Sequence, residues 1–522
     1  MVILKSKYPD IEIPCDVGIY QFVMSNPNQI SDDKAVFIDA ITHKKIAFGN
    51  LKSETRRFAA GLQDHLGFKR GDVLCVYSPN QIDYATVVFG CLAAGGKVSP
   101  ANCSYTAEEL TYQLLDSGAT VIIAHPDTIS KAIEASINAK IPQSNIFVFG
   151  DHEVNGIQPY TSLLGIHEAE PVCFTPEEIK TTTAFLCYSS GTTGRSKGVE
   201  TTHYNVVANL MQTCAFEGDN VHSSLCYLGV LPFYHMYALS VNLHFTLLLG
   251  ATTIVIQKFD IKTFFKAIQD YKVDIAPVVP PILLLMVKNP TDCNLKYVMC
   301  AAAPLSKSLS DDFDRIYRIP IKQLYGLTET SPITHIGPLE KLVNGSVGVL
   351  LPNIQAKIIS ENGHELGFDQ PGELYLRGPM VMKGYLNNQE ATDNCIDKDG
   401  WFRTGDIAKV DKDAPAELES LLLTHPAIAD AAVIGVYSEK EATELPRAYV
   451  VPQGQGPTIK LQQEILQYVA SRVSYFKRLK GGVVFVDKIP KSLSGKILRR
   501  MLRTGKGFNV LTLEESTIKA RL

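Results

Sequence analysis

Short apolar runs alternate with amphipathic stretches over residues 35–180. The runs 72-DVLCVYSP-79 and 121-VIIAH-125 are typical of buried strands, and 106-TAEELTYQLLDSG-118 between them is typical of a helix. Thr106 and Glu109 have the spacing of a capping box, and Gly118 stands where a helix C-cap is expected. This alternation predicts an α/β region in which helices are layered on sheets.

The same pattern continues toward residue 337. Strand-like runs occur at 184–188, 251–259, 273–280, 297–304 and 319–326, and a helix is expected from Asn205. The most apolar long window, 237–256, is interrupted by Asn242, His244 and Gly250. We therefore interpret it as protein core rather than as a membrane span.

The pattern changes after Pro338. Segments 345–359 and 372–385 are rich in strand and turn signals, which predicts a β-barrel-like subdomain over about 338–408. Helix-like segments at 416–426 and 460–473 then alternate with strand-like segments at 429–436 and 482–487. We predict a large N-terminal domain over 1–408, with α/β subdomains over about 1–337, and a small C-terminal α+β lid domain over 409–522.

The charges of the 522 residues nearly balance, with 50 Lys and Arg against 54 Asp and Glu. This balance argues against nucleic acid as the main partner. The eleven cysteines form no CxxC pair and no signal-peptide pattern opens the chain, which favours a reducing compartment without disulfides. The tripeptide Ala520-Arg521-Leu522 fits a variant of the Ser-Lys-Leu signal, so we expect the peroxisome, reached through its import receptor, or otherwise the cytoplasm.

The stretch 188-YSSGTTGRSKGVETTH-203 is rich in glycine and hydroxyl side chains and contains one lysine. Glycine lets backbone N–H groups turn toward an anion, and hydroxyls add donors. A Walker A loop is excluded because Arg195 and Ser196 separate Gly194 from Lys197. Taken alone, it is either a structural turn or a phosphate-binding loop.

Three further strings carry candidate chemistry, namely 323-QLYGLTETSP-332, 403-RTGD-406 and 490-PKSLSGKILRR-500. Together with SSGTTGRSKG, and in this order, they closely resemble the core motifs of the adenylate-forming superfamily. The resemblance covers nearly the whole chain and is strongest to the 4-coumarate:CoA ligase group and to related acyl-CoA synthetases for fatty and aryl acids. It implies ATP-dependent activation of a carboxylic acid to an acyl adenylate and then to a CoA thioester.

The resemblance also implies a role for each motif residue. Glu329 would hold Mg²⁺, Thr328 would contact the α-phosphate, and Lys496 would bridge that phosphate and the incoming carboxylate. Tyr325 would stack on adenine, and Asp406 would accept hydrogen bonds from the ribose. The other nucleotide contacts would be Ser189, Ser190, Gly191, Thr192, Thr193, Gly194, Lys197, Ala302, Ala303, Pro304, Gln323 and Gly326. Singly, each could be a cap, a turn former or a core-edge residue, and it is the joint spacing that favours function.

The acid-binding part is expected near 232-PFYHMYALS-240. This segment has no carboxylate to pair with a substrate ammonium, which argues against α-amino acids. By the resemblance, an apolar slot for an aryl or medium-chain acid would be lined by Tyr237, Ser240, Met299, Ala301 and Pro332. His235 is either a gate beside that slot, and then catalytic, or a packed histidine.

Two features depart from the superfamily pattern. Ser196 stands where the loop usually has proline, which raises loop entropy but removes no donor. The segment 405-GDIAKVDKD-413 joins 414-APAELE-419 directly, without the hinge and the hairpin that line the CoA tunnel in relatives. Because the small domain turns about that hinge in relatives, we predict a chain that binds ATP, adenylates slowly and makes little or no acyl-CoA. The alternatives are a crippled nucleotide-binding homologue and an adenylate-only, luciferase-like enzyme.

Overall fold

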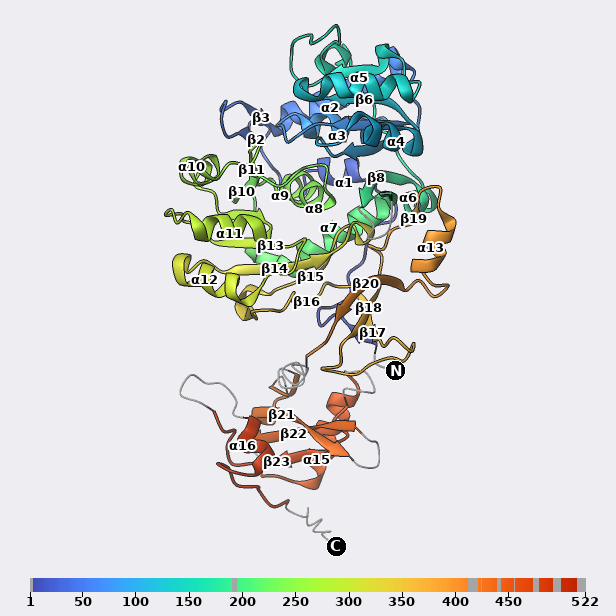
Figure 1. Ribbon diagram of the computed structural model, residues 1–522. Helices are drawn as coiled ribbons and strands as arrows, with labels where there is room; N and C mark the ends of the chain where they lie inside the picture. The colour runs from blue at the N-terminus through green and yellow to red at the C-terminus, as the bar shows by residue number, and fades with distance from the viewer. Residues whose placement is uncertain are drawn as a thin grey trace. The chain divides into compact units, whose positions relative to one another are not determined.

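The chain forms two compact units. A computed structural model describes residues 3–189, 195–411, 421–423, 425–438, 443–454, 456–472, 478–491 and 499–513. The larger unit comprises Ile3–Ala356 and Tyr375–Thr404, and the smaller comprises Lys357–Leu374 and the described residues from Gly405 onward (Figure 1). The domain boundary that we place between residues 408 and 409 stays a prediction.

The larger unit contains a nine-stranded sheet whose central strands are parallel. Its order is β16 (Val349–Leu350), β15 (Ile333–Ile336), β14 (Ile321–Gly326), β13 (Tyr297–Cys300), β12 (Ile275–Val278), β10 (Cys226–Gly229), β11 (Thr252–Val255), β2 (Ala35–Asp39) and β3 (Lys45–Ala47). Strands β2, β11, β10, β12, β13 and β14 pair in parallel, and β15, β16 and β3 are antiparallel additions.

A seven-stranded sheet forms the second layer of the larger unit. Its order is β19 (Gly384–Tyr385), β9 (Lys197–Thr202), β8 (Thr183–Ser189), β5 (Lys97–Ala101), β4 (Val73–Tyr77), β6 (Ala119–Ala124) and β7 (Ile146–Val148). All five residues of β4 are buried, as expected for a parallel strand covered on both faces. The strands predicted in both sheets are thus confirmed.

Helices cover the sheets as the α/β pattern predicts. Helix α4 (Ala107–Ser117) begins with the predicted Thr106–Glu109 capping box and ends at Gly118, whose φ of 67° is left-handed. The other helices of this unit are α1 (Ile19–Met24), α2 (Phe48–Leu66), α3 (Tyr84–Ala93), α5 (Ile129–Asn138), α6 (Pro176–Thr181), α7 (His203–Glu217), α8 (Met236–Ala238), α9 (Thr246–Leu249), α10 (Ile261–Tyr271), α11 (Pro280–Lys288), α12 (Lys307–Tyr317) and α13 (Gln389–Cys395). Figure 1 shows α7 between strands of the two sheets.

The apolar window 237–256 forms core, as predicted. It contributes a π-helix, η5 (Leu239–Phe245), whose seven residues are all buried, followed by α9 and β11. Among the described residues, no helix is both long enough and apolar enough to cross a membrane. All eleven cysteines are free thiols.

The strand-rich region after residue 338 forms an open sheet. Its order is β1 (Leu4–Lys5), β17 (Gln355–Ile359), β18 (Gly372–Arg377) and β20 (Phe402–Ala408), so no closed barrel is formed by the described residues. The smaller unit also contains an α+β part. Its three-stranded sheet has the order β21 (Ile428–Ser438), β22 (Thr443–Pro452) and β23 (Val483–Phe485), and its helices are α15 (Ile459–Ala470) and α16 (Arg499–Thr504).

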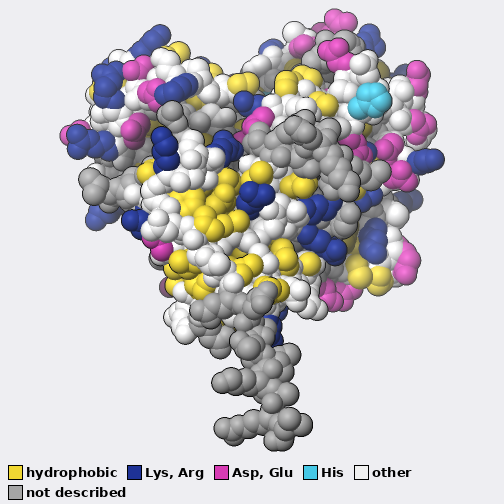
Figure 2. Space-filling model, turned by 90° about the horizontal axis from the view of Figure 1, so that it is seen from below, with side chains coloured by type: hydrophobic (Ala, Val, Ile, Leu, Met, Phe, Trp, Pro, Cys, Tyr) yellow, Lys and Arg dark blue, Asp and Glu magenta, His cyan; other side chains and the backbone are white. Residues whose placement is uncertain are grey.

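Both signs of charge are distributed over the surface. On the face drawn in Figure 2, Lys and Arg side chains and Asp and Glu side chains are both scattered among uncharged ones. This distribution agrees with the formal net charge of −4. Any strong attraction for phosphate must therefore be local rather than a property of the whole protein.

Candidate active site

The candidate nucleotide-binding residues lie where parallel strands end. Strand β8 ends at Ser189, β13 ends at Cys300 and β14 ends at Gly326. Because β13 and β14 are parallel neighbours, the segments 301–304 and 327–329 leave the sheet at the same edge. Carboxyl ends of strands in α/β sheets are the usual position of ligand sites.

The carboxylate of Glu329 joins the two sheets. Its Oε1 atom accepts hydrogen bonds from Ser189 Oγ at 2.9 Å and from Tyr385 Oη at 2.9 Å. Glu329 is only 8% exposed. The ammonium of Lys197 lies 4.4 Å from the centre of the Tyr385 ring. The structure therefore brings together Ser189, Lys197 and Glu329, three residues that the sequence assigns to phosphate and metal binding.

Backbone contacts fix the turn that carries Glu329. The short helix η6 (Thr328–Thr330) follows β14, and Leu327 N–H donates to Thr330 Oγ1 at 2.9 Å. Thr330 Oγ1 donates in turn to the carbonyl of Pro332 at 2.6 Å. A Cβ atom on Gly326 would lie 1.9 Å from that same carbonyl oxygen, so only glycine fits there. Thr328 itself is half-buried beside Glu329.

The predicted adenine site has an exposed loop beside an aromatic ring. Ala302, Ala303 and Pro304 are exposed, and Ala302 has a φ of 71°, a strained value for a non-glycine residue and one that is common at functional sites. Tyr325 is half-buried at the end of β14, and its ring centre lies 5.5 Å from that of His335. Burial lowers the pKa of His335 to about 4, so this histidine is neutral at physiological pH. Gln323 is half-buried on the same strand.

The predicted acid-binding residues come from neighbouring elements of the larger unit. Tyr237 Oη donates to the backbone carbonyl of Met299 at 3.0 Å, so α8 and β13 are in contact. Met299, Ser240 and Ala301 are buried. Pro332 follows a cis peptide bond with Ser331.

His235, which belongs to the segment 232–240, lies in a different environment from these residues. His235 is exposed and its ring lies 4.6 Å from that of Tyr234, and desolvation by its surroundings lowers its pKa from 6.5. Both interpretations of His235, as a gate and as a packed side chain, therefore stay predictions.

Both arms of the glycine-rich loop are anchored on helix α4. Tyr188 Oη donates to Asp116 on the upstream side at 2.7 Å. Downstream, Tyr112 Oη donates to the carbonyl of Ser196 at 3.0 Å, and the Arg195 guanidinium lies 5.2 Å from the Tyr112 ring centre. Sequence reasoning missed these anchors, because the helical spacing of the α4 residues does not show which groups their side chains contact.

Helix α7 holds three backbone segments through buried amides that sequence reasoning also missed. The Asn209 side chain donates to the carbonyl of Ile333 at 2.6 Å and accepts from its N–H at 3.2 Å. Asn205 donates to the carbonyls of Pro379 and Val381, each at 2.8 Å. Gln212 reaches the carbonyl of Pro352 at 2.7 Å. The spacing of these amides by four and three residues along a helix is visible in the sequence. The backbone groups to which they bond are not.

Several predicted residues lie elsewhere. Ser190, Gly191, Thr192, Thr193 and Gly194, together with Lys496, the Asp413–Ala414 junction and Ala520-Arg521-Leu522, lie outside the described residues. Asp406 is an exposed residue of β20 in the smaller unit. The roles assigned to all of these residues stay predictions.

Glu329 is a carboxylate that could hold a metal ion at this site. Among the described residues, no group of three or more His, Cys, Asp or Glu side chains could hold an ion. Mg²⁺ in nucleotide sites commonly takes one or two carboxylates and completes its shell with phosphates and water. The buried Glu329 next to a candidate phosphate loop fits that arrangement.

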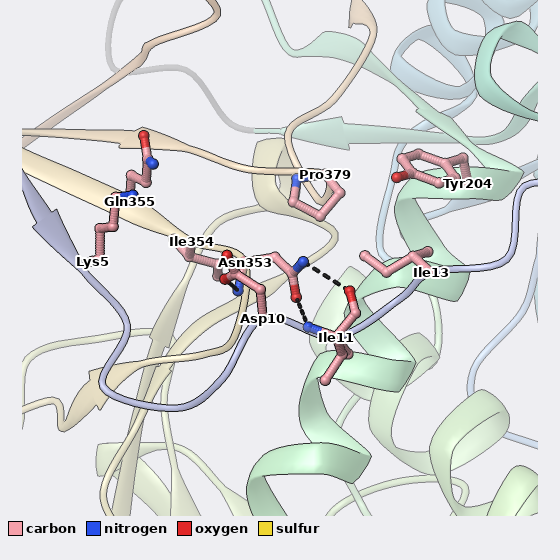
Figure 3. Close-up of a pocket in the computed structure, with 9 residues that line it drawn as sticks. All are labelled: Lys5, Asp10, Ile11, Ile13, Tyr204, Asn353, Ile354, Gln355 and Pro379. Atoms are coloured by element: carbon pink, nitrogen blue, oxygen red, sulfur yellow. Dashed lines mark hydrogen bonds between the residues drawn. The ribbon is translucent and has the colours of Figure 1, made fainter. Parts of the chain in front are cut away.

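A cavity of about 260 Å³ lies apart from these residues. Figure 3 shows that Asn353 spans one side of it, where the side chain accepts from Ile11 N–H at 3.1 Å and donates to the Ile11 carbonyl at 2.9 Å. None of the predicted site residues lines this cavity. Its hydrogen bonds attach the N-terminal segment to the strand β17 region and do not form part of the candidate active site.

Two family models match the chain. Residues 26–386 match the family of AMP-binding enzymes, and residues 417–496 match the AMP-binding enzyme C-terminal domain. A 4-coumarate–CoA ligase-like protein of Arabidopsis thaliana is 35% identical and covers 96% of this chain and 96% of its own length. A phenylacetyl-CoA ligase of Aspergillus niger is 37% identical and covers 90% and 93%.

A solved structure shows the same architecture. The long-chain-fatty-acid-CoA ligase of Archaeoglobus fulgidus is 25% identical, covers 92% of this chain and 99% of its own, and superimposes with a TM-score of 0.70. This likeness confirms the predicted mixed α/β fold with a large N-terminal and a smaller C-terminal domain.

Proposed function

Because this chain belongs to the AMP-binding enzymes and its relatives are named as CoA ligases, we propose that it activates an aryl or medium-chain carboxylic acid through an acyl adenylate. The observation that carries this proposal is the hydrogen bond between Ser189 and Glu329, which places a buried carboxylate at the upstream arm of the Ser/Thr/Gly loop. Lys197 lies at the downstream arm.

The first half reaction brings two anions together, because an acid carboxylate attacks the α-phosphorus of ATP. The barrier is largely electrostatic, so cations and hydrogen-bond donors near the phosphates lower it. Thr328 supplies a hydroxyl donor, Ser189 uses its hydroxyl proton to orient Glu329, and Lys197 supplies a positive charge. Tyr325 stacks on adenine, and the 301–304 loop closes the other side of the ring.

Mg²⁺ would be held by Glu329 together with the phosphate oxygens, and when bound it supplies charge neutralisation to the triphosphate. The protein contributes a carboxylate whose Oε1 atom is already oriented by two hydroxyl donors. Hydrogen bonds between η6 and nearby backbone carbonyls keep that carboxylate at the end of β14. Lys496 then bridges the α-phosphate and the attacking acid.

An aryl acid is the substrate class that we favour. The described segment 232–240 contains no Asp or Glu, which supports an uncharged acid tail rather than an amino acid. The Tyr237 hydroxyl donates its proton to the Met299 carbonyl, so what this side chain could offer an acid beside it is its apolar ring. Two relatives have names that specify aryl acids, 4-coumarate and phenylacetate.

We further propose that thioester formation is weak in this chain. The sequence joins Asp413 to Ala414 without the hinge and hairpin that its relatives use for the second half reaction. A protein that retains the adenylation residues and lacks this hinge releases pyrophosphate but transfers little acyl group to CoA. The alternatives are a nucleotide-binding homologue without turnover and an adenylate-only, luciferase-like enzyme.

Two assays on one preparation distinguish these functions. ATP–pyrophosphate exchange with 4-coumarate, phenylacetate and a medium-chain acid reports adenylation, and acyl-CoA formation reports the second half reaction. We expect exchange with an aryl acid and little thioester. Exchange that is absent with every acid tested refutes the adenylation proposal, and ordinary thioester turnover refutes the proposed impairment.

A further inference from the structure

Tyr385 contacts two of the groups on which the proposed function depends. Its hydroxyl donates to Glu329 Oε1 at 2.9 Å, and its ring lies under the Lys197 ammonium at 4.4 Å. Ser189 donates to the same carboxylate oxygen. Tyr385 is therefore the residue that links the metal-binding carboxylate to the lysine of the phosphate loop.

The backbone of Tyr385 is held on both sides. Strand β19 pairs antiparallel with β9, the strand that begins at Lys197, with Tyr385 opposite Val199. Tyr385 N–H donates to Thr392 Oγ1 of α13 at 2.9 Å. The next residue, Leu386, donates its N–H to the Gly198 carbonyl at 2.8 Å. The phenol is thus fixed relative to the downstream arm of the loop.

The turn that bears Glu329 is attached to the same segment. Met382 N–H donates to the backbone carbonyl of Glu329 at 2.9 Å, three residues before Tyr385. Residues 382–385 therefore hold Glu329 at its backbone and at its side chain. Ser189 restrains the carboxylate from β8 on the other side, so Glu329 is held between the two sheets.

The direction of the Tyr385–Glu329 hydrogen bond follows from chemistry. An ionised carboxylate only accepts hydrogen bonds, so the phenol must donate. A tyrosine phenol, with an ordinary pKa near 10, keeps its proton at physiological pH. The two donors occupy Oε1 and thereby orient the other oxygen, Oε2.

Orientation matters here because Glu329 is the carboxylate that the proposed function assigns to Mg²⁺. No cluster of three potential metal ligands occurs in the described part of the chain. A glutamate side chain that is free to rotate loses conformational entropy when it binds a cation. Donors that hold it in advance remove part of that cost.

We propose that Tyr385 is a positioning residue that orients Glu329 for Mg·ATP and stabilises Lys197 through its ring face; this rests on the proposed function of the site. The residue recognises the nucleotide only through Glu329 and Lys197. Its effect should therefore appear in the metal-dependent part of ATP affinity and not in AMP affinity.

Titration calorimetry on the full chain separates the metal-dependent part of ATP affinity from AMP affinity. AMP is titrated without metal, and ATP is titrated with and without Mg²⁺, for wild type, Tyr385→Phe, Ser189→Ala and the control Tyr317→Phe. Tyr317 donates its hydroxyl to the Met286 carbonyl at 2.9 Å, in a different part of the unit. We expect Y385F to reduce the Mg²⁺-dependent gain in ATP affinity about tenfold, the scale of a hydrogen bond to a charged group. AMP affinity should stay within about twofold.

The outcomes are distinguishable. S189A should also reduce the Mg²⁺-dependent gain, and Y317F should leave it unchanged. A Y385F protein with the wild-type Mg²⁺ dependence overturns the proposal, as does one in which AMP and ATP binding weaken in parallel, because that is a structural effect. A wild-type protein whose ATP affinity does not respond to Mg²⁺ contradicts the proposed function of Glu329 instead.

Discussion

The hydroxyl of Ser189 donates to the Glu329 carboxylate at 2.9 Å, although the two residues are separated by 140 positions in the chain. One residue ends a strand of the seven-stranded sheet, and the other follows a strand of the nine-stranded sheet. The candidate active site therefore exists only when both sheets are packed together.

Replacing Glu329 with glutamine tests the role of its charge. E329Q keeps the size of the side chain and an oxygen that accepts from Ser189, but it removes the negative charge. We expect ATP–pyrophosphate exchange to fall about 100-fold, the scale for loss of one electrostatic contact to the reacting phosphates. The Mg²⁺ concentration for half-maximal rate should rise. Unchanged exchange at low Mg²⁺ would show that another group holds the ion.

The anchor on the downstream arm of the loop should affect ATP use more than stability. Tyr112→Phe removes the hydrogen bond to the Ser196 carbonyl and keeps the ring beside Arg195. We expect KM for ATP to rise several-fold, with a loss of stability of about 1 kcal/mol. Ser196→Pro keeps the carbonyl and stiffens the arm, so it should not raise KM for ATP. Steady-state exchange kinetics with urea unfolding check both variants.

A buried ion pair joins α7 to β14. Lys322 Nζ donates to both carboxylate oxygens of Glu217, at 2.6 and 2.5 Å, and the two side chains are 1% and 2% exposed. Lys322→Met leaves an unpaired buried carboxylate and should cost about 3–5 kcal/mol of the free energy of unfolding. The double variant K322M/E217L should recover most of this loss. Urea unfolding of both variants measures it, and equal destabilisation in the two would contradict the pair as the cause.

Buried histidines should make stability fall in mild acid. Burial lowers the pKa of His203 to about 3, and of His244 and His335 to about 4. Between about pH 6.5 and 4 the unfolded chain binds protons at these sites that the folded protein does not. Stability is therefore complete above pH 6.5 and decreases as the pH falls, by up to about 1.4 kcal/mol per pH unit for each histidine.

A single variant isolates one of these contributions. In His335→Asn the slope of unfolding free energy against pH between 5 and 6.5 should decrease relative to wild type, by up to about 1.4 kcal/mol per pH unit. Burial raises the pKa of Asp83 to about 6, which gives an opposite slope below pH 6, but that contribution is common to both proteins. An unchanged slope in H335N would mean that His335 titrates normally.

The sequence was sufficient to predict local structure where one pattern dominated. The capping box at Thr106 and Glu109 and the left-handed Gly118 are confirmed, because both depend on contacts within a few residues. The α/β layering is confirmed for the same reason, since hydrophobic periodicity reports burial strand by strand. Strand signals alone do not distinguish a barrel-like arrangement from an open sheet, and here the strands form an open sheet.

The site was predictable as a set of motifs but not as a network. Ser189, Lys197 and Glu329 were assigned from their motifs, yet nothing in their spacing indicated that Ser189 would bond Glu329 directly. Tyr385 was interpreted only as part of a strand-rich segment, because its role depends on pairing between β19 and β9. Contacts between residues far apart in the chain are decided by sheet packing, which a local pattern does not report.

We propose that this chain adenylates an aryl acid and transfers it poorly to CoA. The most direct measurement is ATP–pyrophosphate exchange and acyl-CoA formation in parallel, with 4-coumarate and Mg·ATP, on the chain as its sequence stands. We expect exchange that depends on both acid and Mg²⁺, with thioester formed at least about 100-fold more slowly, as for loss of a required closure step. Thioester formation at a rate equal to exchange, or no exchange with any acid, would contradict the account.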